Sequence, residues 1–102
     1  MAFDYVNIDL VVPRFGIPHS FQTKDFDCEY SYYLIDLDAR LKLISKIGCT
    51  KPLPQVQNYT GTIEIYDDFN RFLIDFENGQ VVSIKCAETN ENIEFLQIKN
   101  VN

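Results

Sequence analysis

The chain has 102 residues, a length that folds as one domain around one modest core, so we expect a single domain over residues 1–102. Hydrophobic residues make up 46% of the sequence and charged residues 24%, which is a globular composition and excludes general disorder. Nine Lys and Arg against fifteen Asp and Glu give a net charge of −6. This balance argues against binding to nucleic acid or to anionic membranes, both of which need a cationic surface.

The first predicted strand covers residues 6–12. Apolar residues alternate with polar ones here, and the alternation ends at Pro13. Residues 13–27 follow as a predicted loop, because they contain Pro13, Gly16 and Pro18. A loop of this length is unusual in so small a domain, and long loops often carry binding residues.

Two further strands are predicted over residues 30–36 and 41–44. The intervening residues 37–40 suit a hairpin turn. A short helix over residues 37–47 is the alternative, because this stretch contains several strong helix formers. The flanking residues are β-branched and aromatic, which favours the hairpin. Residues 47–57 contain a glycine and two prolines and are predicted to form a second long loop.

Residues 59–98 predict a four-stranded antiparallel meander. Apolar residues alternate with polar ones between polar turns, and Asn78-Gly79 is the strongest hairpin signal in the chain, because both central residues of a type I′ turn need positive φ. The whole chain therefore predicts a mainly β fold, a single antiparallel sheet of about six to seven strands with little or no helix. A meander, a sandwich and a partly open barrel all remain possible. In this meander Ile63 and Ile65 share one face, and Phe72, Ile74 and Phe76 align on one face. Val82, Ile84 and Cys86 continue the apolar alternation, and the last predicted strand covers residues 93–98.

The cysteines indicate a reducing compartment. Cys28, Cys49 and Cys86 are widely spaced and odd in number, which fits neither a disulfide framework nor a zinc motif. The first ten residues lack the basic and apolar regions of a signal peptide, and no apolar run is long enough to span a bilayer. We therefore expect a cytoplasmic protein, located in the host cytoplasm if a phage encodes it.

Residues suited to catalysis or metal binding are sparse. His19 is the single histidine, and a thiolate at Cys28 paired with it would be an activated nucleophile of an enzyme or sensor, but nothing marks an oxyanion hole. A metal site from His19, Asp25, Asp27 and Cys28 would mix hard and soft ligands without the usual spacing. The sequence therefore predicts no enzyme, no metal and no cofactor.

Carboxylates gather in three short groups. If residues 25–29 are extended, the acidic side chains of the first group all lie on one edge, since side chains two apart share a face. Ordinary solvated surface charge is the simpler interpretation of all three groups. The functional interpretation is an acidic surface that meets a basic groove on a partner. The groups are Asp25, Asp27 and Glu29; Asp36 and Asp38; and Asp67 and Asp68.

Tyrosines cluster next to the first acidic group. Tyr30 and Tyr32 are predicted to share one face of their strand, with Tyr33 on the other. A strand buried on both faces would cover all three rings. If one face is exposed instead, tyrosines beside aspartates are typical of a protein-binding hot spot.

Residues 21–28 read Phe-Gln-Thr-Lys-Asp-Phe-Asp-Cys and precede a tyrosine-containing strand and the turn Asp38-Ala39-Arg40-Leu41. This pattern resembles a group of small uncharacterised proteins of bacterial and prophage genomes, in which an F-Q-T-K-D segment with a nearby cysteine precedes a D-G-R-L turn. The chain has Ala39 where the pattern has Gly, and Thr60 where it often has His. The resemblance covers residues 21–82; it implies a bacterial or phage setting and carries over no activity and no catalytic residues.

The expected function is that of a non-enzymatic, acidic protein-binding domain. It would be an inhibitor of the immunity or phage counter-defence type, occluding a basic site on a toxin, nuclease or defence protein, without binding nucleic acid or membrane directly. The alternative is a structural or self-assembling accessory protein that forms a homodimer through a strand edge or the tyrosine face. The residues expected to bind the partner are Asp25, Asp27, Glu29, Tyr30, Tyr32, Asp67 and Asp68.

Overall fold

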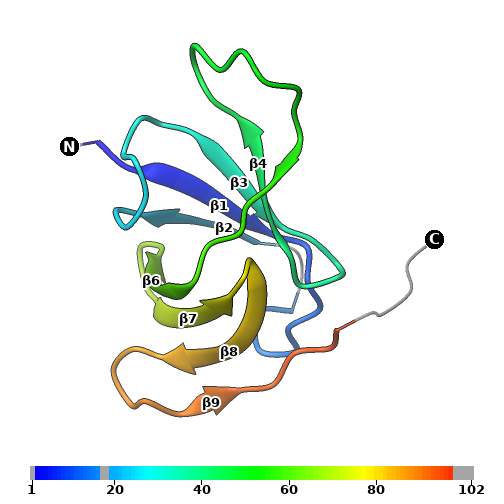
Figure 1. The fold of residues 1–102 in the computed structure, drawn as a ribbon. Helices are drawn as coiled ribbons and strands as arrows, with labels where there is room; N and C mark the ends of the chain where they lie inside the picture. The colour runs from blue at the N-terminus through cyan, green and yellow to red at the C-terminus, as the bar shows by residue number, and fades with distance from the viewer. Residues whose placement is uncertain (1, 17–18, 98–102) are drawn as a thin grey trace.

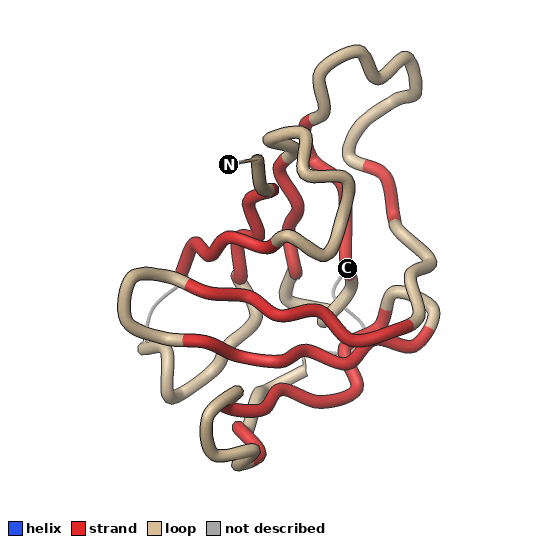
Figure 2. Tube along the Cα trace, turned by 90° about the vertical axis from the view of Figure 1, so that its left-hand side faces the viewer, coloured by secondary structure: helices blue, strands red, loops and turns tan. Residues whose placement is uncertain are grey.

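A computed structural model describes residues 2–16 and 19–97, and these ranges contain strands and turns but no helix (Figure 2). The strands form one mixed sheet in the order β5-β4-β3-β1-β2-β6-β7-β8-β9. β1 and β3 pair in parallel, whereas the other neighbours in the sheet are antiparallel. The strands are β1 (Asp4–Ile8), β2 (His19–Thr23), β3 (Tyr32–Ile35), β4 (Leu41–Ser45), β5 (Gln55–Val56), β6 (Gly61–Tyr66), β7 (Arg71–Glu77), β8 (Gln80–Cys86) and β9 (Asn92–Ile93).

The sheet curls so that β1–β4 lie over β6–β9, with the loop between β4 and β5 projecting beyond the upper half (Figure 1). Backbone hydrogen bonds join the β3–β4 turn to the β7–β8 turn: Leu41 donates to the Gly79 carbonyl at 2.9 Å, and Val81 donates to the Ala39 carbonyl at 2.9 Å. An isolated bridge between Val11 and Leu96 connects the segment after β1 to the segment after β9. The two halves of the sheet are therefore tied together at positions far apart in sequence.

The core fills the space inside this curl. Alternate side chains of β1, β3, β4, β6, β7 and β8 point inward, and burial of this aliphatic and aromatic surface is the main force that closes the sheet. The most deeply buried apolar side chains are Val6, Ile8, Ile35, Leu41, Ile63, Ile65, Ile74 and Ile84.

The mainly β fold in one sheet is confirmed, but two details of the prediction are wrong. The described residues contain nine strands rather than six or seven, because β2 and β5 lie in the segments predicted as long loops. β5 has only two residues, which is too short for an alternation to be visible. The sheet is mixed rather than antiparallel. β2 pairs with one edge of β1 in the antiparallel direction, and β3 pairs with the other edge of β1 in the parallel direction.

The first strand is shorter than predicted, because it ends at Ile8 rather than at residue 12. The backbone N–H groups of Asp9 and Leu10 both donate to the carbonyl of Ile35, at 2.9 and 3.3 Å, which turns the chain away from β3. Leu10 and Val12 are nevertheless buried, so the apolar alternation identified core residues beyond the end of the strand. Pro18, part of the predicted loop, lies outside the described residues.

Residues 37–40 form the predicted hairpin turn and not the alternative helix. The N–H of Ala39 donates to the carbonyl of Asp36 at 2.8 Å, and the N–H of Arg40 donates to the carboxylate of Asp38 at 3.1 Å. Ala39 has a φ of 61°, a conformation that glycine adopts at lower cost, and it is completely buried.

β6–β9 follow one another as the predicted meander, with positive φ at both Asn78 and Gly79. The register shifts between Asp75 and Phe76, so Val81 is 3% exposed while Val82 is 56% exposed. The prediction that Val82 continues the apolar face of Ile84 and Cys86 is therefore wrong, because a bulge exchanges the faces of the two valines.

The last strand of the meander is short. β9 contains only Asn92–Ile93, and Leu96 contributes an isolated bridge further along. Ile98, predicted to continue this strand, lies outside the described residues.

Candidate functional site

An exposed aromatic cluster lies where β1 and β3 begin. The rings of Tyr5 and Tyr32 are stacked with centroids 4.5 Å apart, and Phe3 makes edge contacts with Tyr5 at 5.0 Å and with Tyr30 at 5.2 Å. Tyr30 is 48% exposed and Tyr32 is 43% exposed. We call Phe3, Tyr5, Tyr30 and Tyr32 the aromatic cluster.

Tyr33 points to the opposite, inner face. It is buried and its ring lies 4.4 Å from that of Phe26. Burial, together with the nearby carboxylates of Asp27 and Asp4, raises the pKa of Tyr33 to about 12. The three tyrosines therefore divide between the two faces of the sheet, and the interpretation in which all are covered does not hold.

The aromatic cluster continues as a row across five neighbouring strands. The registers place Tyr32 opposite Tyr5, Tyr5 opposite Gln22, Gln22 opposite Tyr66, and Tyr66 opposite Arg71. All five side chains are half-buried or exposed. The Arg71 guanidinium carbon lies 5.7 Å from the centre of the Tyr66 ring. We call these five residues the cross-strand row.

The loop before Tyr30 is shaped by a buried carboxylate. Asp4 is completely buried, and its oxygens accept hydrogen bonds from the backbone N–H groups of Cys28 at 2.8 Å, Glu29 at 3.1 Å and Ser31 at 2.9 Å. Cys28 and Tyr30 adopt positive φ of 56° and 57°. Residues 25–29 are thus a loop folded around Asp4, and the expectation of an extended segment there is wrong.

Because this segment is not extended, its three carboxylates do not lie side by side along one edge of a strand. Asp25 accepts a hydrogen bond from the backbone N–H of Glu64 at 2.6 Å. Asp27 and Glu29 both face Lys46, with the ammonium group 2.6 and 3.7 Å from their oxygens. The hydrogen bond from Lys46 to Asp27 raises the pKa of this lysine.

The second acidic group shares one lysine. Lys42 lies 2.9 Å from Asp36 and 3.6 Å from Asp38. The hydrogen bond from Lys42, joined by one from the backbone N–H of Leu37, lowers the pKa of Asp36. These contacts join Lys42 of β4 to the turn after β3, and neither carboxylate belongs to the set expected to bind a partner.

The third group lies in the turn between β6 and β7. The Asp67 carboxylate accepts from the backbone N–H groups of Phe69 at 2.8 Å and Asn70 at 2.7 Å, as well as from His19. Desolvation opposes ionisation here, but these hydrogen bonds outweigh it and lower the pKa of Asp67. Asp68 is exposed, and Phe69 beside it is 91% exposed.

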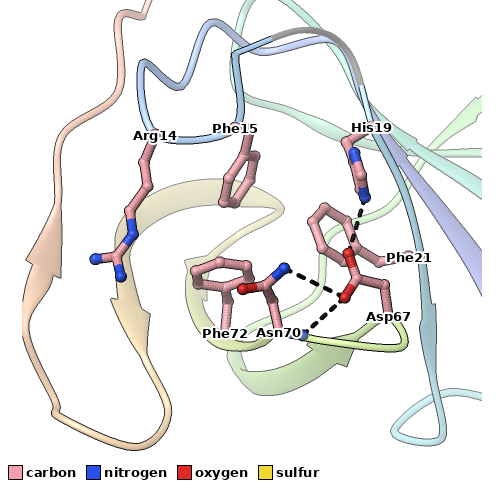
Figure 3. A pocket seen from close by; sticks show the side chains of 7 residues that line it. All are labelled: Arg14, Phe15, His19, Phe21, Asp67, Asn70 and Phe72. Carbon is pink, nitrogen blue, oxygen red and sulfur yellow. Dashed lines mark hydrogen bonds and ion pairs between the residues drawn. The ribbon is translucent and has the colours of Figure 1, made fainter.

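His19 lines a pocket of about 130 Å³ (Figure 3). Its Nε2 lies 2.9 Å from Asp67, whereas the Cys28 thiol donates to the carbonyl of Lys24 at 3.3 Å. The structure therefore pairs His19 with Asp67 and gives the thiol a different partner. The other residues lining the pocket are Arg14, Phe15, Phe21, Asn70 and Phe72.

Residues 2–16 and 19–97 contain neither a metal-binding cluster nor a membrane-crossing helix. No group of three or more His, Cys, Asp or Glu side chains in these ranges is arranged to hold a metal ion. The same part of the chain contains no helix of the length and apolarity that crosses a membrane.

Comparison with known proteins gave no match to a protein-family model, to a curated protein or to a solved structure. The resemblance of residues 21–82 to small bacterial and prophage proteins therefore stays a prediction.

Sequence reasoning missed three features of this site. Asp4 looked like an ordinary polar residue before an alternating strand, and Phe69 looked like a turn residue. Tyr66 has no feature in the local sequence that distinguishes it from another residue of an alternating segment. Pairing between strands far apart in sequence brings Tyr66 next to Gln22, and no local pattern predicts that pairing.

Proposed function

We propose that this chain is a non-enzymatic, acidic protein-binding domain. It acts as an inhibitor of the immunity or phage counter-defence type that covers a basic site on a partner protein in the cytoplasm. The observation that carries the proposal is the aromatic cluster, whose Tyr30 and Tyr32 are 48% and 43% exposed, with the exposed Glu29 next to Tyr30 in the chain. Exposed tyrosines supply large contact area at low entropic cost, and carboxylates around them speed association with a basic surface.

The proposed contact residues divide into two kinds. Asp25 and Asp67 hold neighbouring backbone, so they shape the surface as well as adding charge to it. Asp27, Glu29 and Asp68 are exposed and can be exchanged without removing a backbone hydrogen bond that the structure shows. The complete contact set is Asp25, Asp27, Glu29, Tyr30, Tyr32, Asp67 and Asp68.

The test is capture of a partner from host lysate with two matched triple variants. The first combines Asp27→Lys, Glu29→Lys and Asp68→Lys. The control combines Glu77→Lys, Glu88→Lys and Glu94→Lys, which makes the same change in net charge at exposed positions on β7 and beyond β8. We expect the parent and the control to retain the same partner and the first variant to lose it. Equal retention by both variants would show that the acidic surface does not bind the partner.

Light scattering at several concentrations distinguishes a self-associating accessory protein from a monomeric binding domain. The edge strands β5 and β9 have two residues each, which leaves little backbone for pairing between copies. A homodimer would therefore use the aromatic cluster. A particle that stays monomeric at all concentrations agrees with the proposal, while a dimer abolished by Tyr30→Ser and Tyr32→Ser would replace it.

A further inference from the structure

An open depression of about 480 Å³ lies where the β3–β4 turn meets the β7–β8 turn. Arg40 and Gln80 form an isolated antiparallel bridge there, and the side-chain amide of Gln80 donates to the carbonyl of Asp38 at 3.0 Å. Side chains from three segments that are far apart in sequence therefore surround one hollow. The depression is lined by Arg40, Asn58, Glu77, Asn78, Gln80 and Val82.

Arg40 has no counterion within the part of the chain that the structure describes. Its side chain is half-buried, and its guanidinium makes neither an ion pair nor a hydrogen bond with residues 2–16 or 19–97. Other cationic side chains do pair with carboxylates, namely Arg14 with Glu91, Lys42 with Asp36 and Asp38, Lys46 with Asp27 and Glu29, and Arg71 with Glu64. A half-buried charge without a partner is costly, because it loses hydration without gaining an opposite charge. An anion from outside the domain would remove this cost.

The groups around Arg40 suit an anion that carries an apolar part. The side-chain amides of Asn58 and Asn78 are exposed and have no hydrogen-bond partner within the described ranges, so their N–H groups are free to donate. Val82, which the bulge turns outward, is 56% exposed and adds an apolar wall. Guanidinium groups bind carboxylates through two parallel hydrogen bonds, and side-chain amides add further donors.

Glu77 limits the charge of the ligand, because it places a carboxylate in the lining. A ligand with a single negative charge is repelled less by this carboxylate than a phosphate dianion is.

We propose that this depression binds a carboxylate attached to an apolar group, as found at a peptide C-terminus or in a small aliphatic acid. The carboxylate pairs with Arg40, and the apolar group packs on Val82. This inference goes beyond the proposed function, because no residue of the lining belongs to the aromatic cluster or to the contact set.

The test uses the isolated domain and three probes: the dipeptide acetyl-alanyl-valine with a free C-terminus, the same dipeptide with an amidated C-terminus, and isovalerate. In NMR titrations we expect the free dipeptide to bind about tenfold more tightly than the amide, with the largest shifts at the backbone amides of Arg40, Asn78 and Gln80. Isovalerate has the same charge and a branched apolar group but no peptide backbone. Binding as tight as that of the dipeptide would assign the depression to small acids, and weaker binding would assign it to peptide C-termini.

Two matched pairs of variants locate the binding. Arg40→Gln is expected to weaken the free dipeptide about tenfold or more, while Lys51→Gln, which removes an exposed positive charge outside the lining, leaves it unchanged. Val82→Ala is expected to weaken binding about twofold to threefold, while Ile47→Ala, which shortens another exposed apolar side chain, has no effect. Arg40→Lys keeps the charge but loses the paired hydrogen bonds, so it should give an intermediate loss even if Arg40→Gln does not fold.

Equal binding of the acid and the amide forms of the dipeptide, or equal losses within each pair of variants, would overturn the carboxylate site. None of these measurements involves the captured partner. The proposed function is refuted separately, by retention of the partner after reversal of Asp27, Glu29 and Asp68.

Discussion

At the scale of single residues, Asp4 has the largest effect on the shape of the site. It is completely buried and satisfies three backbone N–H groups of the loop that carries Tyr30. A buried carboxylate is tolerated when several donors surround it, and each such bond to a charged acceptor contributes about 1.5–3 kcal/mol. Asp4 thus links the fold of β1 to the position of the aromatic cluster.

We predict that Asp4→Ala lowers the free energy of unfolding by about 3 kcal/mol or more, because three N–H groups lose their acceptor together. Urea denaturation measures the change. Asp9→Ala, at an exposed position just after the same strand, is the control and should stay within about 0.5 kcal/mol of the parent. Equal effects of the two substitutions would contradict the role of Asp4.

Tyr33 gives a prediction for alkaline pH. Its pKa of about 12 lies above the ordinary value of 10.0, so the fold favours the neutral phenol. The stabilisation is complete below pH 10 and is lost as the pH rises through 12. Urea denaturation at several pH values should show falling stability in this window for the parent and a smaller fall for Tyr33→Phe. Identical pH profiles would show that Tyr33 does not contribute.

At the scale of strands, the bulge in the β7–β8 hairpin determines which valine enters the core. The register shift between Asp75 and Phe76 buries Val81 and exposes Val82. One extra residue reverses the faces of the following positions, because side chains alternate with a period of two.

We predict that Val81→Ala destabilises the protein by about 2 kcal/mol, because it removes two buried methyl groups. Val82→Ala should change the stability by less than about 0.5 kcal/mol, because Val82 is exposed. Thermal or urea denaturation of the two variants measures the difference. A larger loss of stability for Val82→Ala than for Val81→Ala would contradict the bulge, because simple alternation places Val82 in the core.

The same hairpin illustrates what the sequence could predict. Asn78-Gly79 and the alternation around it located β6, β7 and β8, because the needed information lies within a few residues. The bulge, the two-residue strand β5 and the parallel pairing of β1 with β3 depend on tertiary contacts that have no local pattern. The site divides in the same way: the sequence shows that Tyr30 and Tyr32 cluster beside acidic residues, whereas their exposure and the roles of Asp4 and Tyr66 depend on contacts with distant segments.

At the scale of the whole molecule, the contact between the two hairpin turns holds the curled sheet together. Gly79 accepts from Leu41 and donates to the carbonyl of Tyr59 at 2.7 Å. A Cβ at this glycine would lie 1.9 Å from the carbonyl oxygen of Gln57, so the close approach requires glycine.

Comparing Gly79→Ala with Gly48→Ala separates this steric effect from backbone strain. Both glycines have nearly the same φ, 79° and 78°, but a Cβ at Gly48 meets nothing within 4 Å. We expect Gly48→Ala to cost about 1–2 kcal/mol and Gly79→Ala distinctly more. Equal losses of unfolding free energy for the two variants would show that the backbone at Gly79 does not approach Gln57 this closely.

The acidic surface also acts at the scale of the molecule. A net charge of −6 creates a field that extends beyond any single contact, and the exposed carboxylates of Asp27, Glu29 and Asp68 contribute to it. Such a field raises the rate at which a basic partner is encountered, and salt screens it.

The most direct test of the central claim is the association rate constant with the captured partner, measured at low and high salt. For the parent, and for the Glu77, Glu88 and Glu94 control, we predict a fall of about tenfold or more as salt rises. For the variant carrying lysine at positions 27, 29 and 68, the rate at low salt should be much lower and depend only weakly on salt. A parent rate that does not change with salt, or a reversed variant that associates as fast as the parent, would contradict an acidic surface that recognises a basic partner.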